Sequence, residues 1–334
     1  MGAKAGGGMN NRRKLVIALG VGVLTAPLGS LAQPQGKVWR IGFLGRETAA
    51  GYEKELEAFR AGLKKFGYVE GKNLVIGYRW AEGDDDRLPQ LAGELLREKA
   101  DILVTHSSPG VRAALRATTT VPIVAASMAI DPVALGLVKS LARPGGNMTG
   151  ILSLSQTVNV KQVELARDAL PSARKVAWMG TPTTQGWTEK DMGVVAKTLK
   201  LDLQFAPVSS ASDLEATIAG MAQQRIEAVI VSFQPLFVSN FSRIAALAAH
   251  QRIPMLGPVH FADSGGLIGY GPNVRENYRR AGYFIDRIFK GAKPGDLPIE
   301  QPTKFELVVN LKTAKALGIT IPPKVMARAD RVIK

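Results

Sequence analysis

The fold of this chain is set by residues 38–66, which read VWRIGFLGRETAAGYEKELEAFRAGLKKF. The stretch opens with a short β-type apolar run, Val38 to Leu44. Apolar side chains then recur at spacings of three and four: Leu56, Phe59, Leu63 and Phe66. This periodicity places them on one face of a helix, and Gly67 follows as a residue that readily ends one. A strand followed by an amphipathic helix is the repeating unit of α/β proteins.

The same unit recurs along the rest of the chain. Strand-like runs stand at 74–78, 102–105 and 123–126, and past a Gly-Pro turn at 143–147 they resume at 149–152, 176–179, 203–208 and 228–231. Uncharged strands joined by amphipathic helices predict parallel sheets covered on both faces. The turn at 143–147 predicts a division into two lobes. A helix at 278–289 and a strand at 305–310 remain after two complete units, so we expect the chain to cross between the lobes more than once.

Residues 12–32 have the pattern of an export signal. The basic triplet at 12–14 precedes an apolar segment, 15–28, and the small residues Ser30 and Ala32 stand where a signal peptidase reads. Pro27 interrupts the apolar segment, which is shorter than the roughly 20 residues that cross a bilayer, so a retained anchor is the less favoured alternative. We expect residues 1–32 to be a signal peptide cleaved near Ala32 and the protein to be periplasmic. Arg12 and Arg13 leave the twin-arginine export route open.

Composition excludes several classes of function. The chain has no cysteine, so it cannot form disulfides, thiolate metal sites or a thiol nucleophile, nor carry a lipid on an N-terminal cysteine. Its formal charge is +15, four positive groups lie in the predicted leader, and the remaining excess is spread along the chain. Aromatic residues make up 6% and form no cluster for stacking bases. A solvated basic surface is therefore favoured over nucleic-acid binding.

Familiar catalytic signatures are missing from the sequence. It contains no G-x-S-x-G, no H-E-x-x-H, no Walker loop, and no G-x-G-x-x-G between a strand and a helix. Of the three histidines, His250 is expected at the surface or a helix end, whereas His106 and His260 each follow a strand. We expect a protein that is not an enzyme and that carries neither a metal nor a cofactor.

Two acidic motifs indicate helix starts. Asp84, Asp85 and Asp86 could bind a hard cation, but they stand just before a helix, where acids cap free N–H groups and complement the helix dipole. The capping interpretation is favoured. Ser212 and Glu215 have the spacing of a capping box, in which each side chain satisfies the other's backbone N–H.

Candidate ligand contacts stand just after the predicted strands. The carboxyl ends of parallel strands share one edge of a sheet, where ligands gather and helix N-termini present unpaired N–H groups. In the first lobe and its edge the expected ligand-binding residues are Gly45, Arg46, His106, Ser107, Ser108, Ser127, Met128 and Asp131. In the second lobe they are Thr181, Thr183, Trp187, Phe233, Gln234 and His260.

The serine pair Ser107 and Ser108 is the sharpest of these candidates. Two hydroxyls beside a helix N-terminus could hold a carboxylate or another small polar group. The alternative is that both residues are ordinary helix caps. Trp187 and Phe233 could stack on a ligand, although core packing is the commoner role of an isolated aromatic residue.

Several stretches of the chain resemble one known family. They are AFRAGL at 58–63, GYVEGKN at 67–73, YRWAEG at 78–83, DPV at 131–133, GLVKSLARPGGNMTG at 136–150, GGL at 265–267, YGPN at 270–273, QPTKFEL at 301–307 and AKALG at 314–318. These stretches resemble ABC-transporter substrate-binding proteins of the type I periplasmic-binding fold, in the branch where some relatives bind aromatic amino acids. The resemblance covers nearly all of the chain after the leader, and 136–150 is its most specific part.

The resemblance implies an α/β fold of two Rossmann-like lobes with parallel sheets. Three hinge crossovers would join them, near residue 147, at 270–273 and at 300–303. Residues 38–147 plus 273–300 would form the N-terminal lobe, and residues 148–272 plus 303–334 the C-terminal lobe. The implied function is capture of a small organic solute, an amino acid, aromatic acid or similar carboxylate, by lobe closure and its delivery to an ABC permease. The protein is expected to be a monomer.

The chain departs from the family pattern at two places. Thr181-Pro182-Thr183-Thr184 stands where relatives often carry an Asn-Pro pair, and Gln234 stands where they often carry an acid. Without that acid an obvious partner for a ligand ammonium group is missing, which weakens the case for an amino acid. Two other functions stay open, a sensory adaptor that binds the same kind of solute and an exported α/β enzyme with His106 or His260 as its base.

Overall fold

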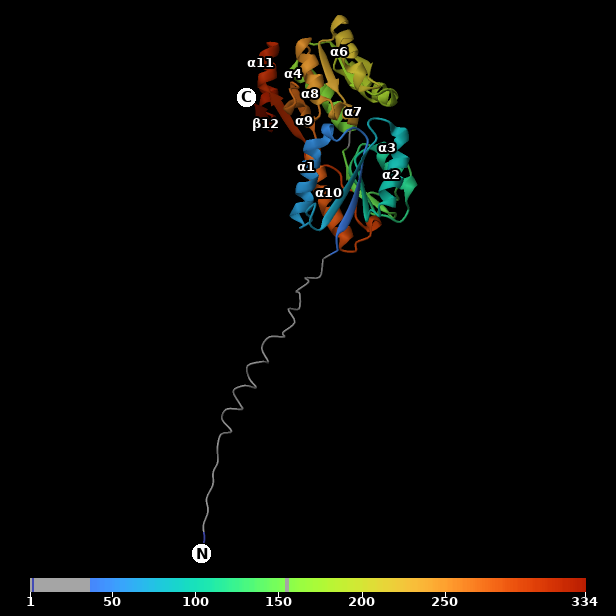
Figure 1. The fold of residues 1–334 in the computed structure, drawn as a ribbon. Helices are drawn as coiled ribbons and strands as arrows, with labels where there is room; N and C mark the ends of the chain where they lie inside the picture. The colour runs from blue at the N-terminus through green and yellow to red at the C-terminus, as the bar shows by residue number, and fades with distance from the viewer. Residues whose placement is uncertain (1, 3–36, 154–155) are drawn as a thin grey trace. The chain divides into compact units, whose positions relative to one another are not determined.

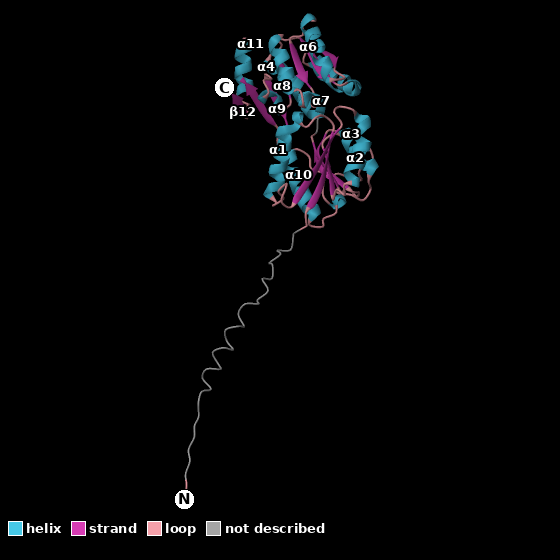
Figure 2. Ribbon diagram, viewed as in Figure 1, coloured by secondary structure: helices cyan, strands magenta, loops and turns pink. Residues whose placement is uncertain are grey.

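Residues 38–334 are organised, as far as the structure describes them, around two β-sheets flanked by helices (Figures 1 and 2). The computed structural model describes Gly2 and residues 37–153 and 156–334, without the side chains of residues 156–157 and 184–191. The predicted signal peptide, residues 1–32, therefore lies outside the described residues apart from Gly2.

The first sheet is parallel throughout and has the strand order β2-β1-β3-β4-β5. Its strands are β1 (Trp39–Gly45), β2 (Leu74–Trp80), β3 (Ile102–Thr105), β4 (Ile123–Met128) and β5 (Met148–Leu152). The helices that cover it are α1 (Glu53–Lys65), α2 (Leu88–Arg97), α3 (Ser108–Ala117) and α10 (Val274–Phe289). This sheet with its helices is called the first lobe below.

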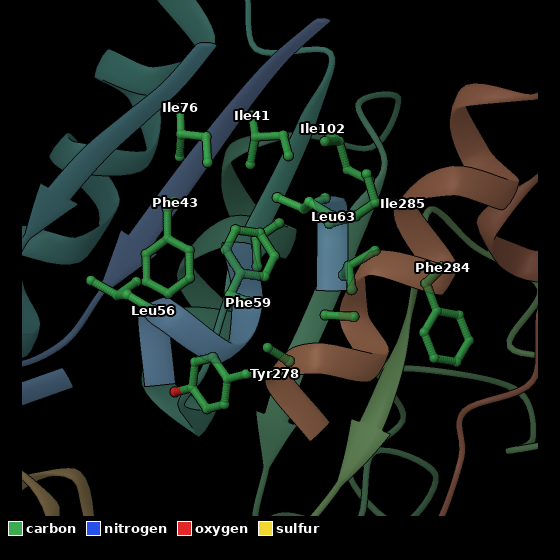
Figure 3. Close-up of a cluster of buried hydrophobic side chains, with 14 of the residues drawn as sticks. Ile41, Phe43, Leu56, Phe59, Leu63, Ile76, Ile102, Tyr278, Phe284 and Ile285 are labelled. Atoms are coloured by element: carbon green, nitrogen blue, oxygen red, sulfur yellow. The ribbon is translucent and has the colours of Figure 1, made fainter. Parts of the chain in front are cut away.

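Helices cover both faces of the first sheet, as the uncharged strands predict. Ile102 and Val104 of β3 belong to the core that α1 and α10 cover, while Leu103 between them belongs to the core under α2 and α3. Figure 1 shows the two helix pairs on opposite faces of the sheet. Figure 3 shows the first of these cores, where Phe59 and Leu63 of α1 lie with Ile285 of α10. A parallel sheet buried on both faces needs apolar residues at every position, which explains the continuous apolar runs.

The helices α1 and α10 meet through two glycines. A Cβ added to Gly62 would lie 2.1 Å from the carbonyl oxygen of Arg279, and one added to Gly282 would lie 2.5 Å from the carbonyl carbon of Gly62. The helix backbones therefore approach each other more closely than any side chain would allow. This close approach lets the large side chains of Phe59 and Phe284 fill the core on either side.

The strand β5 lies in the first sheet and not in the second lobe, where the sequence interpretation placed residues 149–152. It pairs in parallel with β4. The turn at 143–147 consequently joins two strands of one sheet and is not a crossing between lobes. Its anchors explain why: the Asn147 side chain donates to the carbonyl oxygens of Thr118 and Val121 at 3.0 and 2.9 Å, and both belong to the first lobe.

The second sheet has the strand order β12-β11-β10-β9-β8-β6-β7. Its strands are β6 (Lys175–Gly180), β7 (Asp202–Pro207), β8 (Ala228–Val231), β9 (Met255–Gly257), β10 (Ile268–Gly271), β11 (Glu306–Asn310) and β12 (Arg331–Ile333). Its helices are α4 (Gln156–Ala169), α5 (Gln185–Thr198), α6 (Leu214–Gln223), α7 (Pro235–Val238), α8 (Phe241–His250), α9 (Val259–Asp263), α11 (Leu311–Leu317) and α12 (Pro323–Met326). This sheet with its helices is called the second lobe.

One strand pair of the second sheet differs from the prediction of parallel sheets. β11 runs antiparallel to β10, whereas the other pairings of this sheet are parallel. The connectivity explains the difference. The chain leaves the carboxyl end of β10 for α10 in the first lobe and returns to the second sheet from the same side, so β11 must run in the opposite direction.

The chain passes between the lobes at several points in the described residues. It leaves β5 for α4, it passes from β10 to α10 through Pro272 and Asn273, and it returns before β11. The third passage stays close to the first, because the N–H of Glu300 donates to Gly150 at 2.9 Å and the N–H of Leu152 donates to Glu300 at 2.8 Å. The third passage therefore lies against the carboxyl end of β5.

The acidic motifs are helix caps, with one of them shifted. The Asp84 carboxylate accepts from the N–H of Asp86 at 3.0 Å at the start of a 3₁₀ turn, which confirms the capping interpretation. The capping box lies two residues earlier than predicted, because Asp213 and not Glu215 accepts from the backbone N–H of Ser210, at 2.9 Å.

Within the described residues no helix has both the length and the apolar character needed to cross a membrane.

Candidate functional site

His106 lies at the carboxyl end of β3, buried among aromatic rings. Its ring centroid is 4.3 Å from that of Tyr52. Three further rings have centroids 5.8 to 6.1 Å away: Phe43, Trp80 and Tyr278. Only 4% of His106 is exposed. The sequence interpretation singled out His106 but not these rings, because they come from η1 (Ala50–Tyr52), β1, β2 and α10, which are distant in sequence.

The surroundings of His106 keep its imidazole ring neutral and leave one ring N–H as a hydrogen-bond donor. Its Nε2 accepts from the backbone N–H of Arg46 at 3.3 Å. Burial, together with the positive charge of Arg46, lowers the pKa of His106 to about 3. A neutral imidazole whose Nε2 accepts carries its proton on Nδ1. That Nδ1 is buried and has no partner among the described residues, so an N–H donor is left unsatisfied beside the strand ends.

Arg46 offers no free positive charge to a ligand. Its guanidinium pairs with Glu47 and, at 2.5 Å, with Asp85. Burial raises the pKa of Glu47 while the Arg46 charge opposes that rise. Gly45, the residue before, packs flat against Trp80, and an added Cβ would lie 2.1 Å from the indole ring. Both predicted residues therefore organise the loop after β1.

Several other predicted residues cap turns and helices. The Ser107 Oγ accepts a hydrogen bond from the N–H of Gly110 at 3.1 Å, so Ser107 caps the N-terminus of α3. This is the alternative role that the sequence left open for it. Ser108 is half-buried at the first position of α3. Asp131 is exposed, and its carboxylate accepts from two backbone N–H groups that follow it, at 2.9 and 3.1 Å.

A small cavity lies where the two lobes meet. Its walls include Ser153, Gln162, Phe233, Tyr270, Pro272 and Val274. Ser153 follows β5 and Val274 begins α10, so the first lobe contributes to a wall made mostly by the second. The free space is about 20 Å³, roughly enough for one water molecule. The carboxyl ends of β5, β8 and β10 thus converge on one point.

The predicted residues Ser127, Met128 and Phe233 lie at or next to this cavity. Phe233 forms part of its wall and also packs against the core of the first lobe, although it follows β8 of the second. Ser127 Oγ donates to Ser153 Oγ at 3.0 Å, and the N–H of Ser153 donates to the carbonyl of Met128 at 2.8 Å. The end of β4 therefore supports the cavity wall through Ser153.

Gln162 is a cavity residue that the sequence interpretation missed. It lies on α4 with 2% of its surface exposed. Its Nε2 donates to the carbonyl oxygen of Tyr270 at 2.9 Å, and its Oε1 is buried without a partner in the described part of the chain. The sequence did contain a signal for this residue. Gln162 is a polar side chain on the apolar face of a helix, one turn after Val158 and beside Val163.

His260 belongs to a polar cluster at the second passage. This passage cluster consists of His260, Asp263, Asn273, Arg275 and Glu306. The Asn273 Nδ2 donates to Glu306 at 3.0 Å, so its Oδ1 faces His260 Nε2, also at 3.0 Å. His260 Nδ1 lies 3.2 Å from the Asp263 carboxylate. Both ring nitrogens of His260 therefore lie within hydrogen-bond distance of side-chain oxygen atoms.

The passage cluster joins elements of both lobes. Arg275 of α10 pairs with Glu55 of α1 at 3.3 Å and with Asp263 of α9 at 3.8 Å. Burial raises the pKa of Asp263, but hydrogen bonds from His260 and Arg331 outweigh it and the net pKa is lowered. A wider cleft of about 330 Å³ lies alongside, between the start of α1 and residues 238–243. His260 thus borders this cleft and not the small cavity.

The remaining predicted residues follow β6 and β8. Thr181 Oγ1 and Thr183 Oγ1 lie 3.0 Å apart. Gln234 is half-buried at the N-cap of α7. The Trp187 side chain lies outside the described residues. Among the residues that the structure describes, no group of three or more histidine and acidic side chains is placed to hold a metal ion.

In the described residues, two α/β lobes meet at a cavity where strand ends converge, which is the architecture of a two-lobed α/β protein. The model of the family described as ABC transporter substrate binding protein matches residues 49–333, and the chain belongs to this family. The family resemblance inferred from the sequence is thereby confirmed.

Individual relatives agree with this assignment. The tyrosine-binding protein of Clostridioides difficile (strain R20291) is 27% identical over 273 residues, which are 80% of this chain and 77% of that protein. The crystal structure of a conserved domain protein from Vibrio cholerae is 26% identical, has a TM-score of 0.79, and is matched over 89% of this chain and 100% of its own. An ABC domain from Streptococcus pneumonia in complex with L-Trp is 24% identical, with a TM-score of 0.78 over 88% of this chain and 99% of its own, and shows the same fold.

Proposed function

We propose that this protein is an extracytoplasmic receptor that captures a small organic solute between its lobes and delivers it to an ABC importer. The observation that carries the proposal is the cavity between the lobes, which is lined from both sides and includes the Gln162 Oε1, a buried oxygen without a partner among the described residues. Burying a polar atom without a hydrogen-bond partner costs free energy. A native protein that keeps such an atom therefore needs a reason for it, and a bound ligand that supplies the missing partner is one. Family membership supports the same function.

Lobe closure is the mechanism that we propose. The cavity has room for about one water molecule, so a solute the size of an amino acid enters only when the lobes separate. The passages between the lobes are the places where the backbone would bend. A solute that contacts both lobes stabilises the closed form, and it does so only through its higher affinity for that form. No covalent chemistry is needed, so we propose binding without turnover.

We propose that the solute is an amino acid, an aromatic acid or a similar carboxylate. A relative that is 27% identical is named for tyrosine binding, which supports this range. Two buried donors of the first lobe have no partner among the described residues, His106 Nδ1 and Asn277 Nδ2. N–H donors of this kind stabilise a carboxylate that is removed from water. Phe233 and Tyr270 offer apolar contact for the rest of the solute.

The remaining expectations from the sequence are part of the same proposal. The leader would be cleaved near Ala32, the receptor would act as a monomer, and the permease would meet the closed lobes. We propose Ser127, Met128 and Phe233 as the predicted residues that border the bound solute, together with His106. Ser153 and Gln162 join this set because they line the cavity.

A thermal unfolding screen tests solute binding. The purified protein is heated with amino acids, aromatic acids and other small organic compounds, one at a time. A solute present at 100 times its Kd stabilises the folded state by about 2.7 kcal/mol and raises the Tm. At least one compound should do so. If no compound in a broad panel changes the Tm, the proposed function is wrong.

Cell experiments separate the three functions that the sequence left open. Deleting the gene should abolish uptake of the solute found in the screen. Normal uptake with a lost signalling response would favour the sensory adaptor. Conversion of the bound compound, followed by mass spectrometry, would favour the enzyme.

A further inference from the structure

The orientation of the Gln162 amide is fixed by the protein. Its Nε2 donates to the backbone carbonyl of Tyr270 at 2.9 Å, and a carbonyl oxygen can only accept. The opposite assignment of the amide would place two acceptors together. The Oε1 is therefore held in place as an acceptor, buried in a residue that is 2% exposed and that lines the cavity between the lobes.

The described wall of this cavity carries no charged side chain. The acidic groups at the passages have partners away from this wall: Glu55 pairs with Arg275, Glu300 with Arg280 at 2.7 Å, and Asp263 with Arg331 at 2.6 Å. Glu306 accepts from the Asn273 amide at 3.0 Å. A cationic group placed against Gln162 would lose its hydration without gaining a counter-charge, which is unfavourable. An uncharged donor loses far less and is satisfied by one amide oxygen.

Apart from Ser153 and Asn159, the wall around Gln162 is apolar and partly aromatic. Phe233, Val158 and Val274 contribute to the wall, and Tyr270 is stacked on Phe305 with ring centroids 6.3 Å apart. A flat ring fits between such surfaces and presents a polar atom only at its edge.

We propose that Gln162 determines specificity by accepting a hydrogen bond from an uncharged ring hydroxyl at the edge of an aromatic solute. The inference rests on the proposed function, because it concerns the same cavity. A solute that lacks the donor leaves the Oε1 buried and unpaired. The expected discrimination against it is roughly tenfold to a hundredfold in Kd.

Calorimetric titration with matched solute pairs tests the inference. The pairs are tyrosine with phenylalanine, 4-hydroxybenzoate with benzoate, and 4-hydroxyphenylacetate with phenylacetate, whose members differ by one hydroxyl. The variant Gln162→Met removes the acceptor at nearly constant volume. The control Gln223→Met makes the same substitution at an exposed position on α6.

The wild type should bind the hydroxylated member of at least one pair ten times more tightly or better. Gln162→Met should reduce that ratio to about one, mainly by weakening the hydroxylated member, while Gln223→Met keeps the wild-type ratio. Equal affinity for both members in the wild type overturns the proposal without any variant. So does a ratio that survives Gln162→Met, an equal loss for both members, or failure of every hydroxylated member to bind.

These outcomes are distinct from failure of the proposed function. Binding of other small organic solutes with no preference for a hydroxyl would overturn the role of Gln162 alone. A purely structural role would lower the Tm of Gln162→Met and leave the ratio of affinities unchanged.

Discussion

Replacing Gly62 by alanine is expected to destabilise the protein, although alanine is the better helix former. Gly62 lies inside α1 where that helix crosses α10, and the new methyl group would be placed 2.1 Å from the carbonyl oxygen of Arg279. That oxygen belongs to a helix backbone and cannot rotate away. The two helices would have to separate, and the core between them, with Phe59 and Ile285 in it, would lose contact.

The magnitude follows from two opposing contributions. Alanine gains about 1 kcal/mol over glycine in a helix interior. Overpacking a closely packed contact costs about 1–3 kcal/mol and sometimes more, and a 2.1 Å approach to backbone belongs at the upper end of that range. We therefore expect Gly62→Ala to lower the free energy of unfolding by about 2 kcal/mol.

Urea denaturation of Gly62→Ala and a matched control measures this difference. The control is Gly220→Ala on α6, where no described heavy atom beyond the chain neighbours and the adjoining helix backbone lies within 4 Å of the added Cβ. It should gain about 0.5–1 kcal/mol, because only the helix preference acts. If both variants shift in the same direction, or if Gly62→Ala is as stable as the wild type, the account of the helix crossing is wrong.

Three further predictions concern the site. Because the pKa of His106 is lowered to about 3 in the folded state, against about 6.5 in the unfolded state, its stabilising contribution is complete above about pH 6.5 and declines as the pH falls toward 3. The slope should be about 1.4 kcal/mol per pH unit, and His106→Gln should remove that slope in urea titrations between pH 4 and 8. Ser107→Ala should lose about 1 kcal/mol through its cap on α3 and change the Kd of the bound solute less than twofold; a larger change would restore Ser107 as a ligand contact. Asp263→Ala should lose about 1–3 kcal/mol, since it leaves His260 and Arg331 without their partner, and an unchanged Tm would contradict that role.

Local sequence patterns predicted individual helices and strands well in both lobes. Leu56, Phe59 and Leu63 are all buried on one face of α1, as their spacing indicates. The strands at 102–105 and 228–231 have the bounds that the pattern predicts. These features depend on periodicity and on residues close in sequence, which a single chain displays directly.

Strand pairing could not be predicted in the same way. Residues 149–152 follow a turn and look like the start of a new unit, but their partner is chosen by contacts with β4 and by the anchoring of Asn147. The direction of β11 depends on where the chain re-enters the second sheet, and β12, with three residues, is too short to stand out. Register and pairing order are properties of distant segments.

The candidate site was predicted only at its edges. The rule that ligands gather after parallel strands pointed to Phe233, which lines the cavity, and to Ser127, which donates to the cavity residue Ser153. It missed Ser153 and Gln162, since Gln162 lies in the middle of a helix and gains its role from the carbonyl of Tyr270, more than 100 residues away. Ser107 and Asp131 matched the same rule and instead cap local backbone.

The most direct test of lobe closure on a solute is the distance between two spin labels, one on each lobe. The chain has no cysteine of its own, so Thr48→Cys, after β1, and Ser209→Cys, after β7, can be labelled specifically at exposed positions. Pulsed dipolar spectroscopy should give a broad distribution without solute and a shorter, narrower one with a saturating solute from the unfolding screen. The same distribution in both samples would contradict capture by closure.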